Sequence, residues 1–344
     1  MPKIRVLVVD DSILFRETLS RAISEDPSIE VIATAGDAFQ AEDKIHQLKP
    51  DVVTLDVEMP KLNGIDFLKK LIPQTPIPVV VVSAMPVSAF QALDAGAVDF
   101  VKKPVVKTSD DMRIFAKELC GKIKIAKNAK VTPGGRIRPD TLTGTQFFAA
   151  PNMLKHRDTV IALGASTGGT DALQVVIQNL PETTPPILIV QHMPAGFTNM
   201  YATRLNRICK MEVQEAKNGD RLKPGRVLIA AGEYHMRLAR DTQGYYVKCA
   251  QGDRVSGHCP SVDVLFDSVA DIAGKKAIGA ILTGMGADGA KGLLKMRKAG
   301  AYTIGQDKES CIVYGMPMVA FNIGGVEKQA PLTRISSIIM EKLK

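Results

Sequence analysis

The sequence has no tryptophan, and aromatic residues make up only 5% of its 344 residues. Proteins that bind single-stranded nucleic acids stack bases on aromatic side chains placed among basic ones, and no segment here has that pattern. No apolar run approaches the ~20 residues that a membrane-spanning helix needs. The N-terminal stretch MPKIRVLVVDDS is typical of a buried strand, whereas a signal peptide has a longer apolar region and a small-residue cleavage site. We therefore expect a cytoplasmic protein with no membrane insertion and no nucleic-acid partner.

The five cysteines form no C-x-x-C pair and no zinc-finger spacing, which favours reduced thiols. Cys259, in GHCPSVD, remains an alternative as a catalytic thiol. The net charge of +8 is concentrated between residues 102 and 157, where thirteen Lys and Arg face four Asp and Glu. Proline, glycine and threonine accumulate in the second half of that segment, which indicates a helix followed by a linker.

The rest of the chain predicts two folded domains of the α/β class. Five β-branched strands alternate with amphipathic helices over the first 120 residues or so, which is the pattern of a doubly wound parallel sheet. A second alternating set begins at TVIALG, and residues 226–250 read as a hairpin-like β excursion within it. We place the first domain at 1–122, the linker at 123–156 and the second domain, with a Rossmann-like parallel sheet, at 157–344.

Polar and charged side chains gather at the predicted strand ends of the first domain. These residues are Asp10, Asp11, Asp56, Ser83 and Lys103. Functional groups of open parallel sheets collect at the carboxyl ends of strands. Three carboxylates brought together need a cation, and Mg²⁺ prefers such oxygen ligands. For each aspartate alone, the alternative is a helix cap.

This set resembles the flavodoxin-like receiver domain of two-component response regulators. The resemblance implies that Asp56 accepts a phosphoryl group, and that Asp11, Asp56 and the carbonyl of Glu58 bind Mg²⁺ with help from Asp10. It also implies that Ser83 and Lys103 contact the phosphoryl group. Only twenty positions separate these two residues, so the fourth helix is expected to be short.

The second domain opens with GASTG, residues 164–168, which matches G-x-S-x-G between a predicted strand and a predicted helix. In that context a serine, here Ser166, stands above the sheet on a sharp turn. A glycine-rich turn that binds phosphate or only packs closely is the alternative. The hydroxyl needs a base, and His192 is the only one of five histidines that directly follows a strongly apolar strand.

The stretch GMGADG, residues 284–289, fits the dinucleotide-binding pattern G-x-G-x-x-G. NAD binding is therefore one reading of it. A second is that Asp288 caps the helix that follows. A third is that Asp288, at a converging strand end, orients His192 and stabilises its imidazolium form.

The combination resembles the chemotaxis response regulators that are protein-glutamate methylesterases, the CheB family. The matching stretches are GASTGGTDAL, VQHMPAGFT, HCPSVDVLF, ILTGMGADGAKGL and GQDKESCIVYGMP. The resemblance implies a triad of Ser166, His192 and Asp288, with Thr167 and the Met285 backbone beside the substrate. It speaks against NAD, which would leave Ser166 and His192 without a role. Cys259 stands where family members commonly carry arginine.

The implied function is the phosphorylation-activated hydrolysis of glutamate γ-methyl esters on chemoreceptors, with deamidation of receptor glutamines as a further activity. The implied partners are methyl-accepting chemoreceptors as substrates and a chemotaxis histidine kinase as phosphodonor. Ester hydrolysis itself needs no cofactor. The alternative is a phosphorylation-controlled docking module with an inactive esterase-like domain, and a DNA-binding regulator is a weaker rival because no helix-turn-helix pattern is present.

Overall fold

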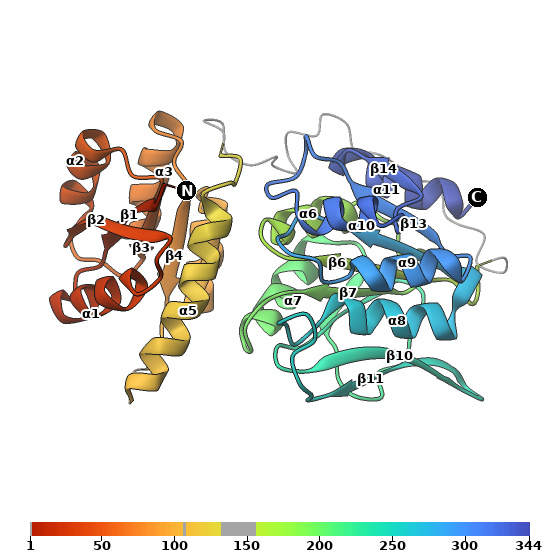
Figure 1. Cartoon of the computed structure of the whole chain (residues 1–344). Helices are drawn as coiled ribbons and strands as arrows, with labels where there is room; N and C mark the ends of the chain where they lie inside the picture. Colours follow the sequence, from red (N-terminus) through yellow and green to blue (C-terminus); the bar gives the residue numbers. More distant parts are fainter. Residues whose placement is uncertain (1, 106–107, 132–155) are drawn as a thin grey trace. The chain divides into compact units, whose positions relative to one another are not determined.

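The computed structural model describes residues 2–105, 108–131 and 156–344 (Figure 1). The chain divides into two compact units, 1–136 and 137–344, which we describe separately. Most of the linker predicted at 123–156 lies outside the described residues. Helix α5 continues past residue 122 to Ala126, so the first part of that segment is helical.

The first unit is a five-stranded parallel sheet with the strand order β2-β1-β3-β4-β5, which confirms the doubly wound prediction. The strands are β1 (Ile4–Val9), β2 (Ile29–Ala35), β3 (Val52–Asp56), β4 (Val79–Ser83) and β5 (Asp99–Lys102). The helices are α1 (Ile13–Ser24), α2 (Ala38–Leu48), α3 (Gly64–Gln74), α4 (Pro86–Asp94) and α5 (Ser109–Ala126). With nine residues, α4 is the shortest of these helices.

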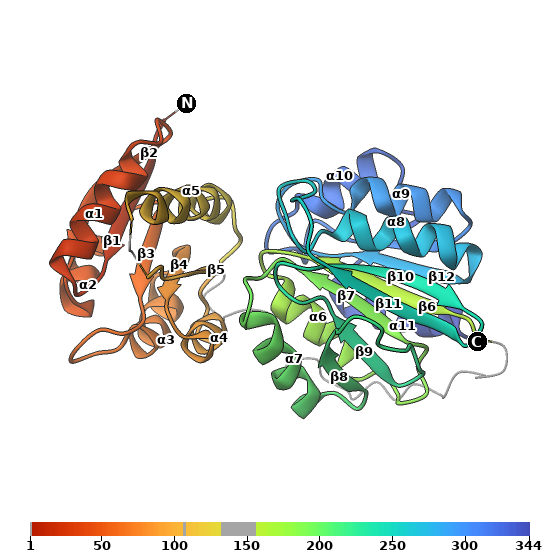
Figure 2. The same cartoon turned by 90° about the horizontal axis from the view of Figure 1, so that it is seen from below.

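Helices cover both faces of this sheet. Helix α1 packs with α5 on one face, and α3 contacts α2 and α4 on the other (Figure 2). Every residue of β3 and β4 is buried, which explains why neither strand shows the alternation of apolar and polar residues that a half-exposed strand has. Because all strand pairs are parallel, the polar residues at the carboxyl ends of the strands lie at one edge of the sheet.

The second unit contains a seven-stranded parallel sheet with the order β14-β13-β12-β6-β7-β9-β8 and a separate antiparallel hairpin. The sheet strands are β6 (Val160–Ala165), β7 (Ile187–Gln191), β8 (Glu212–Glu215), β9 (Arg226–Ile229), β12 (Ala277–Ile281), β13 (Tyr302–Gln306) and β14 (Lys328–Ala330). The hairpin strands are β10 (His235–Asp241) and β11 (Gly244–Ala250).

In the described part of the second unit, six α-helices lie on the two faces of the sheet (Figure 2). They are α6 (Gly169–Ile177), α7 (Phe197–Ile208), α8 (Val262–Ile272), α9 (Ala290–Lys298), α10 (Met316–Asn322) and α11 (Leu332–Lys342). Helix α8 packs against α9 and β6 and also contacts β10 of the hairpin, whereas α11 contacts α6 on the opposite face. The core of this unit is apolar and includes Leu188, Phe266 and Leu293, all fully buried.

The prediction for residues 226–250 is confirmed for β10 and β11 but is wrong for the segment RVLI. That segment forms β9, which pairs in parallel with β7 and β8 and belongs to the main sheet. Three of its four residues are buried. A strand covered on both faces fits the interior of a parallel sheet better than a hairpin with one exposed face.

Within the described residues, no helix has both the length and the apolar character that crossing a membrane would require.

Candidate functional site

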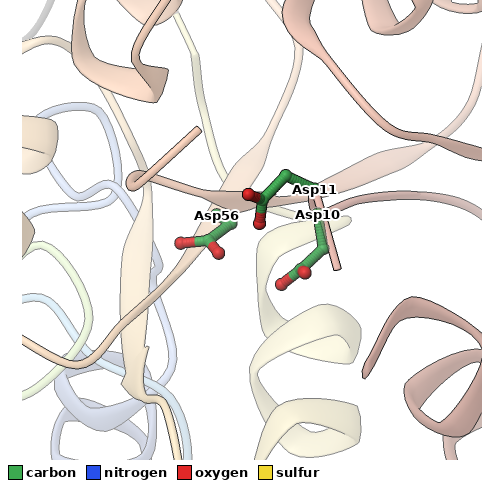
Figure 3. Close-up of side chains that lie close together, drawn as sticks. All are labelled: Asp10, Asp11 and Asp56. Carbon is green, nitrogen blue, oxygen red and sulfur yellow. The ribbon is translucent and has the colours of Figure 1, made fainter. Parts of the chain in front are cut away.

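Three aspartates meet at the carboxyl edge of the first sheet. Asp10 and Asp11 follow β1, and Asp56 ends β3, the strand paired with β1. One carboxylate oxygen of each lies within 4.8 Å of the others, and Figure 3 shows the three side chains gathered at this edge. Asp10 and Asp56 are buried, while Asp11 is exposed. The structure therefore brings together the three aspartates predicted to lie at neighbouring strand ends.

Lys103 is the cation of this cluster. Its Nζ donates to Asp10 Oδ2 at 2.8 Å and also to Asp56 Oδ2. The same ammonium group lies 4.5 Å from the centre of the Phe15 ring. Burial raises the pKa of Asp10 to about 6, even though its bond with Lys103 acts in the opposite direction. Burial also works to lower the pKa of Lys103, but the two carboxylates outweigh it and the pKa is raised.

Ser83 and Glu58 stand at the margins of the cluster. The Ser83 hydroxyl donates to Met85 O at 3.1 Å and accepts from Met85 N at 3.2 Å, so it is engaged in the turn that precedes α4. The Glu58 amide donates to Asp56 Oδ1 at 3.1 Å and thereby helps to orient that carboxylate. The amide of Lys103 donates to Ser83 O, which ties the ends of β4 and β5 together.

The second unit places its candidate residues at the carboxyl ends of three adjacent strands, in the order β12-β6-β7. Ala165 of β6 pairs with Gln191 of β7, so Ser166 and His192 each follow a paired position. The His192 amide donates to Ala165 O at 3.2 Å, and the Ser166 amide donates to Thr283 O at 3.0 Å in the segment after β12. The main chain thus fixes all three loops to one another.

His192 and Asp288 form the central contact of this site. Nε2 of His192 lies 2.7 Å from Oδ2 of Asp288, and both side chains are almost fully buried. Burial works to raise the pKa of Asp288, but the hydrogen bond and charge interaction with His192, together with bonds from Ser261 and Val262, outweigh it and the pKa is lowered. The carboxylate is therefore ionised at neutral pH and can stabilise an imidazolium.

Asp288 accepts hydrogen bonds from the N-terminus of α8, whereas one reading of the sequence has it cap α9, the helix that follows it in the chain. Helix α9 begins after Gly289 and has no side-chain cap. Asp288 instead accepts from the first turn of α8. Its donors are Ser261 Oγ at 2.7 Å, Val262 N at 2.7 Å and Asp263 N at 3.1 Å. A carboxylate at a helix N-terminus is stabilised by the unpaired N–H groups and by the helix dipole.

The other ring nitrogen of His192 is available for chemistry. Nδ1 is buried and has no hydrogen-bond partner within the described residues. The imidazole of His258 stacks on that of His192, with ring centroids 3.6 Å apart and planes 9° from parallel. One face of the ring is thus covered, its Nε2 is held by Asp288, and Nδ1 is left as the free acceptor.

Ser166 lies against the GMGADG turn. A Cβ placed on Gly284 would come within 2.7 Å of Ser166 Cβ and 2.5 Å of Met316 Sδ, so only glycine allows this close approach. Ser166 is 7% exposed and directly precedes the turn that starts α6. In the described part of the chain its hydroxyl makes no hydrogen bond to His192, a contact that apo active sites often complete only with substrate.

Thr167 directly follows the serine in the chain, and Met285 directly follows the glycine that lies against it. Thr167 is buried, and its carbonyl accepts from Thr283 Oγ1 at 3.0 Å. Met285 follows Gly284, the residue that lies against Ser166, and is 41% exposed, which places a flexible apolar group at the surface. Helix α6 begins two residues after Thr167, at Gly169.

Several residues of the site carry no signal that sequence reasoning used. Gln191 Nε2 donates to Ser166 O at 2.9 Å and to His192 O at 3.2 Å, and so bridges the two catalytic candidates. Thr283 ties the loops after β6 and β12 through its hydroxyl. Each of the two lies next to a recognised residue or motif. Ser261 and His258 lie within or next to the stretch HCPSVDVLF, which contributed to the resemblance without roles of their own.

The thiol of Cys259 is not suited to act as a nucleophile. Burial raises its pKa, so the protonated form prevails at neutral pH, whereas a reactive cysteine needs a stabilised thiolate.

The glycines of GMGADG are required by local packing and backbone conformation. Gly289 has a positive φ of 86°, and a Cβ there would meet the Val262 side chain at 2.5 Å.

Comparison with known proteins agrees with this geometry. The CheB methylesterase family matches residues 161–339, and the response regulator receiver domain family matches residues 6–113. The chain is 56% identical to the protein-glutamate methylesterase/protein-glutamine glutaminase 2 of Syntrophomonas wolfei subsp. wolfei, over 98% of this chain and 97% of that protein. It is 44% identical to the protein-glutamate methylesterase/protein-glutamine glutaminase of Salmonella typhimurium, over 100% and 98%. The crystal structure of the Thermotoga maritima CheB methylesterase catalytic domain matches with a TM-score of 0.52 and 38% identity, over 54% of this chain and 98% of that domain.

Proposed function

This chain belongs to the CheB methylesterase family, and on that basis we propose that it hydrolyses glutamate γ-methyl esters on chemoreceptors under the control of its receiver domain. It is an ester hydrolase whose relatives are also named glutaminases, so receptor glutamines are the second substrate class. The observation that carries the proposal is the 2.7 Å contact of His192 with Asp288 at a strand end adjacent to Ser166.

Ser166 is the nucleophile in this proposal, and Nδ1 of His192 is its base. As Oγ attacks the ester carbonyl carbon, its proton passes to Nδ1, while Nε2–H stays bonded to Asp288. The protonated Nδ1 then gives the proton to the leaving methoxide, which departs as methanol. Water enters by the reverse sequence and releases the glutamate. Asp288 remains a carboxylate throughout, because its bonds within the site favour the ionised form.

The oxyanion of the tetrahedral intermediate requires donors near Ser166. We assign this task to the N–H groups at the start of α6, three residues after Ser166, and to the backbone of Met285, which follows the closely packed Gly284. Thr167 lies between Ser166 and α6 and is the residue we place beside the substrate. The exposed Met285 side chain would contact the apolar stem of the substrate glutamate.

The receiver unit supplies the control in this proposal. Asp56 is the phosphoacceptor, with a chemotaxis histidine kinase as the phosphodonor. The donor set fits Mg²⁺, because an oxygen of each of three carboxylates lies within 4.8 Å of the others. Burial raises the pKa of Asp10, and a bound cation would stabilise its ionised form. Asp11, Asp56 and the Glu58 carbonyl would hold the ion, and the ion would neutralise charge during phosphoryl transfer. Lys103 and Ser83 would then contact the phosphoryl oxygens.

Two rival functions are less well supported. A docking module with an inactive esterase fold would have no use for a buried, hydrogen-bonded His192–Asp288 pair, and the full-length relatives are named as enzymes. NAD binding through GMGADG is not supported either, because two of its glycines accommodate Ser166, Met316 and Val262.

The test is methanol release from methylated chemoreceptor membranes, with and without acetyl phosphate and Mg²⁺. Wild type is compared with Ser166→Ala and Asp56→Asn, and ammonia is measured in parallel to detect deamidation. We expect methanol release from wild type that increases with phosphodonor. Ser166→Ala should abolish it, and Asp56→Asn should retain a basal rate that the phosphodonor does not increase.

Two matched controls guard against general damage to the fold. Ser268→Ala removes another serine hydroxyl of the second unit, and Asp66→Asn removes an exposed carboxylate on α3. Both should behave as wild type. Release that persists in Ser166→Ala would overturn the nucleophile assignment, and its absence from wild type with several receptors would favour the docking module.

A further inference from the structure

Ser261 is a fully buried serine at the N-cap of α8. Its hydroxyl donates to Asp288 Oδ1 at 2.7 Å, and the other carboxylate oxygen, Oδ2, contacts His192 at the same distance. The hydroxyl oxygen of Ser261 also accepts a hydrogen bond from the Val264 amide at 3.4 Å. A serine hydroxyl has a single proton, and since Val264 uses a lone pair, that proton is committed to Asp288.

The main chain of Ser261 is held from the other side. Its amide donates to Nδ1 of His235 at 3.3 Å, and the opposite ring nitrogen of His235 lies 2.9 Å from Asp253 O. An imidazole that accepts at Nδ1 donates at Nε2, so both contacts require the neutral ring. Ser261 therefore cannot rotate or shift without breaking bonds to α8, β10 or Asp288.

We propose that Ser261 is a positioning residue for the ester hydrolysis, which holds Asp288 so that its second oxygen meets Nε2 of His192. The inference rests on the proposed function above and adds a fourth side chain to its mechanism. Oδ1 is fixed by Ser261 and the Asp263 amide, and Oδ2 is fixed by Val262 N and His192. All acceptor directions of the carboxylate are thus used, which locks its plane.

Loss of the Ser261 donor changes the proton affinity of the pair. A carboxylate with one donor fewer binds protons more tightly and attracts the imidazolium of His192 more strongly. The other titratable groups around the pair are His258 on the ring, His235 behind Ser261, and Asp263, whose carboxylate accepts from Gly292 N. None of these three takes over the bond to Oδ1.

The hydroxyl also caps α8, and the two roles must be separated. Replacing an N-cap serine by alanine weakens a helix substantially, whereas glycine at the same position restores most of the capping preference. If Ser261 acts only as a cap, Ser261→Gly will keep its activity. If it positions Asp288, Ser261→Gly and Ser261→Ala will lose activity together.

The experiment compares Ser261→Ala, Ser261→Gly and Ser268→Ala with wild type as full-length proteins. Ser268 lies on the same helix and bonds Leu238 N, without contact to Asp288. The readouts are kcat/KM for methyl ester hydrolysis as a function of pH, thermal unfolding, and the ¹⁵N NMR signals of the His192 ring. The NMR measurement needs no turnover, so it tests the inference even if the substrate assignment fails.

We expect both Ser261 variants to lose about tenfold or more in kcat/KM, as for removal of a hydrogen bond to a charged group. Ser261→Gly should unfold at a higher temperature than Ser261→Ala, because glycine is the better N-cap, and Ser268→Ala should keep wild-type activity. The acid limb of kcat/KM should move to higher pH, and the ¹⁵N signals of the His192 ring should change in both Ser261 variants but not in Ser268→Ala. Wild-type kcat/KM in Ser261→Gly, or unchanged His192 ring signals, would overturn the inference. An inactive wild type with changed ring signals in the Ser261 variants would overturn only the proposed function.

Discussion

The imidazole of His258 lies parallel to that of His192, with their centroids 3.6 Å apart. His258 is itself fixed by a tight turn, in which its amide donates to Val255 O and its carbonyl accepts from Val255 N, each at 3.0 Å. The residues between them, Ser256 and Gly257, both have positive φ. A rigid turn therefore presents a flat ring to the proposed base.

His258→Ala should reduce kcat/KM for methyl ester hydrolysis by roughly 2- to 10-fold, the worth of one stacked ring pair. His258→Phe, which keeps a flat ring, should recover most of the loss. His46→Ala, on α2 of the first unit, is the matched control and should have no effect on the same assay. Equal losses in the Ala and Phe variants would show that stacking is not what His258 contributes.

The contact with Asp288 also fixes the tautomer of His192. Neutral His192 should carry its proton on Nε2, where the carboxylate accepts it, and leave Nδ1 unprotonated. The ¹⁵N shifts and couplings of the neutral ring, measured by NMR, report this directly. In Asp288→Asn the Nε2–H form should lose its preference, and kcat should decrease by several orders of magnitude. A predominant Nδ1–H form in wild type would contradict the proposed proton path.

Asp10→Asn should stabilise the metal-free receiver unit, and by more at pH 7.5 than at pH 4.5. Burial raises the pKa of Asp10 to about 6 in the folded state, above its value of about 4 in an unfolded chain. Ionising Asp10 therefore costs stability as pH rises from about 4 to about 6, and the full cost is present above that range. Asparagine has no such proton to lose.

The expected gain at pH 7.5 is about 1 to 3 kcal/mol, which calorimetric unfolding of the full chain in EDTA would detect. Asp66→Asn is the control, because this exposed carboxylate has a pKa that Lys69 and Asn63 lower instead. Added Mg²⁺ should stabilise wild type more than Asp10→Asn. A stability difference that is the same at both pH values would be incompatible with the buried position of Asp10.

Gly284→Ala should disrupt the catalytic site. The new methyl group would lie 2.5 Å from Met316 Sδ, which can move, but also 3.1 Å from the main-chain nitrogen of Ser166, which can move less. Overpacking of this kind costs about 1 to 3 kcal/mol, and displacement of Ser166 should reduce kcat strongly. Full activity of the variant would contradict the close approach described here.

Gly121→Ala is the matched glycine substitution. Gly121 lies in α5, and no atom stands within 4 Å of the position that a Cβ would take. Because alanine is the better helix former by about 1 kcal/mol, this variant should unfold at a slightly higher temperature and keep its esterase activity. Thermal unfolding of both variants in parallel separates crowding from loss of backbone freedom.

The sites could be located from the sequence because parallel sheets deliver their strand ends to one edge. Asp56 and Ser166 each stand at or just after the end of a buried apolar run, and their partners follow neighbouring strands. Among five histidines, only His192 occupied such a position. The pairing of β6 with both β7 and β12 then placed the three candidate residues side by side.

Ser261 could not be found in the same way, because its importance depends on tertiary contacts. Its acceptor lies 27 residues further along the chain, and no periodic pattern connects an N-cap serine of α8 to the loop after β12. The short strands β8 and β14, EVQE and KQA, were missed because they are polar and are defined by their neighbours in the sheet. The segment RVLI was misplaced because four residues carry too little pattern to distinguish a hairpin from a central strand.

The hydrogen bonds from α8 to Asp288 couple the local unfolding of the first turn of α8 to the orientation of the catalytic site. The amide protons of Val262 and Asp263 are held by the carboxylate that also orients His192. Any fluctuation that frays the first turn of α8 exposes these two amides to exchange with solvent deuterium and at the same time releases Asp288. The exchange rate of the two amides therefore measures how often a folded molecule briefly loses the orientation of its catalytic histidine.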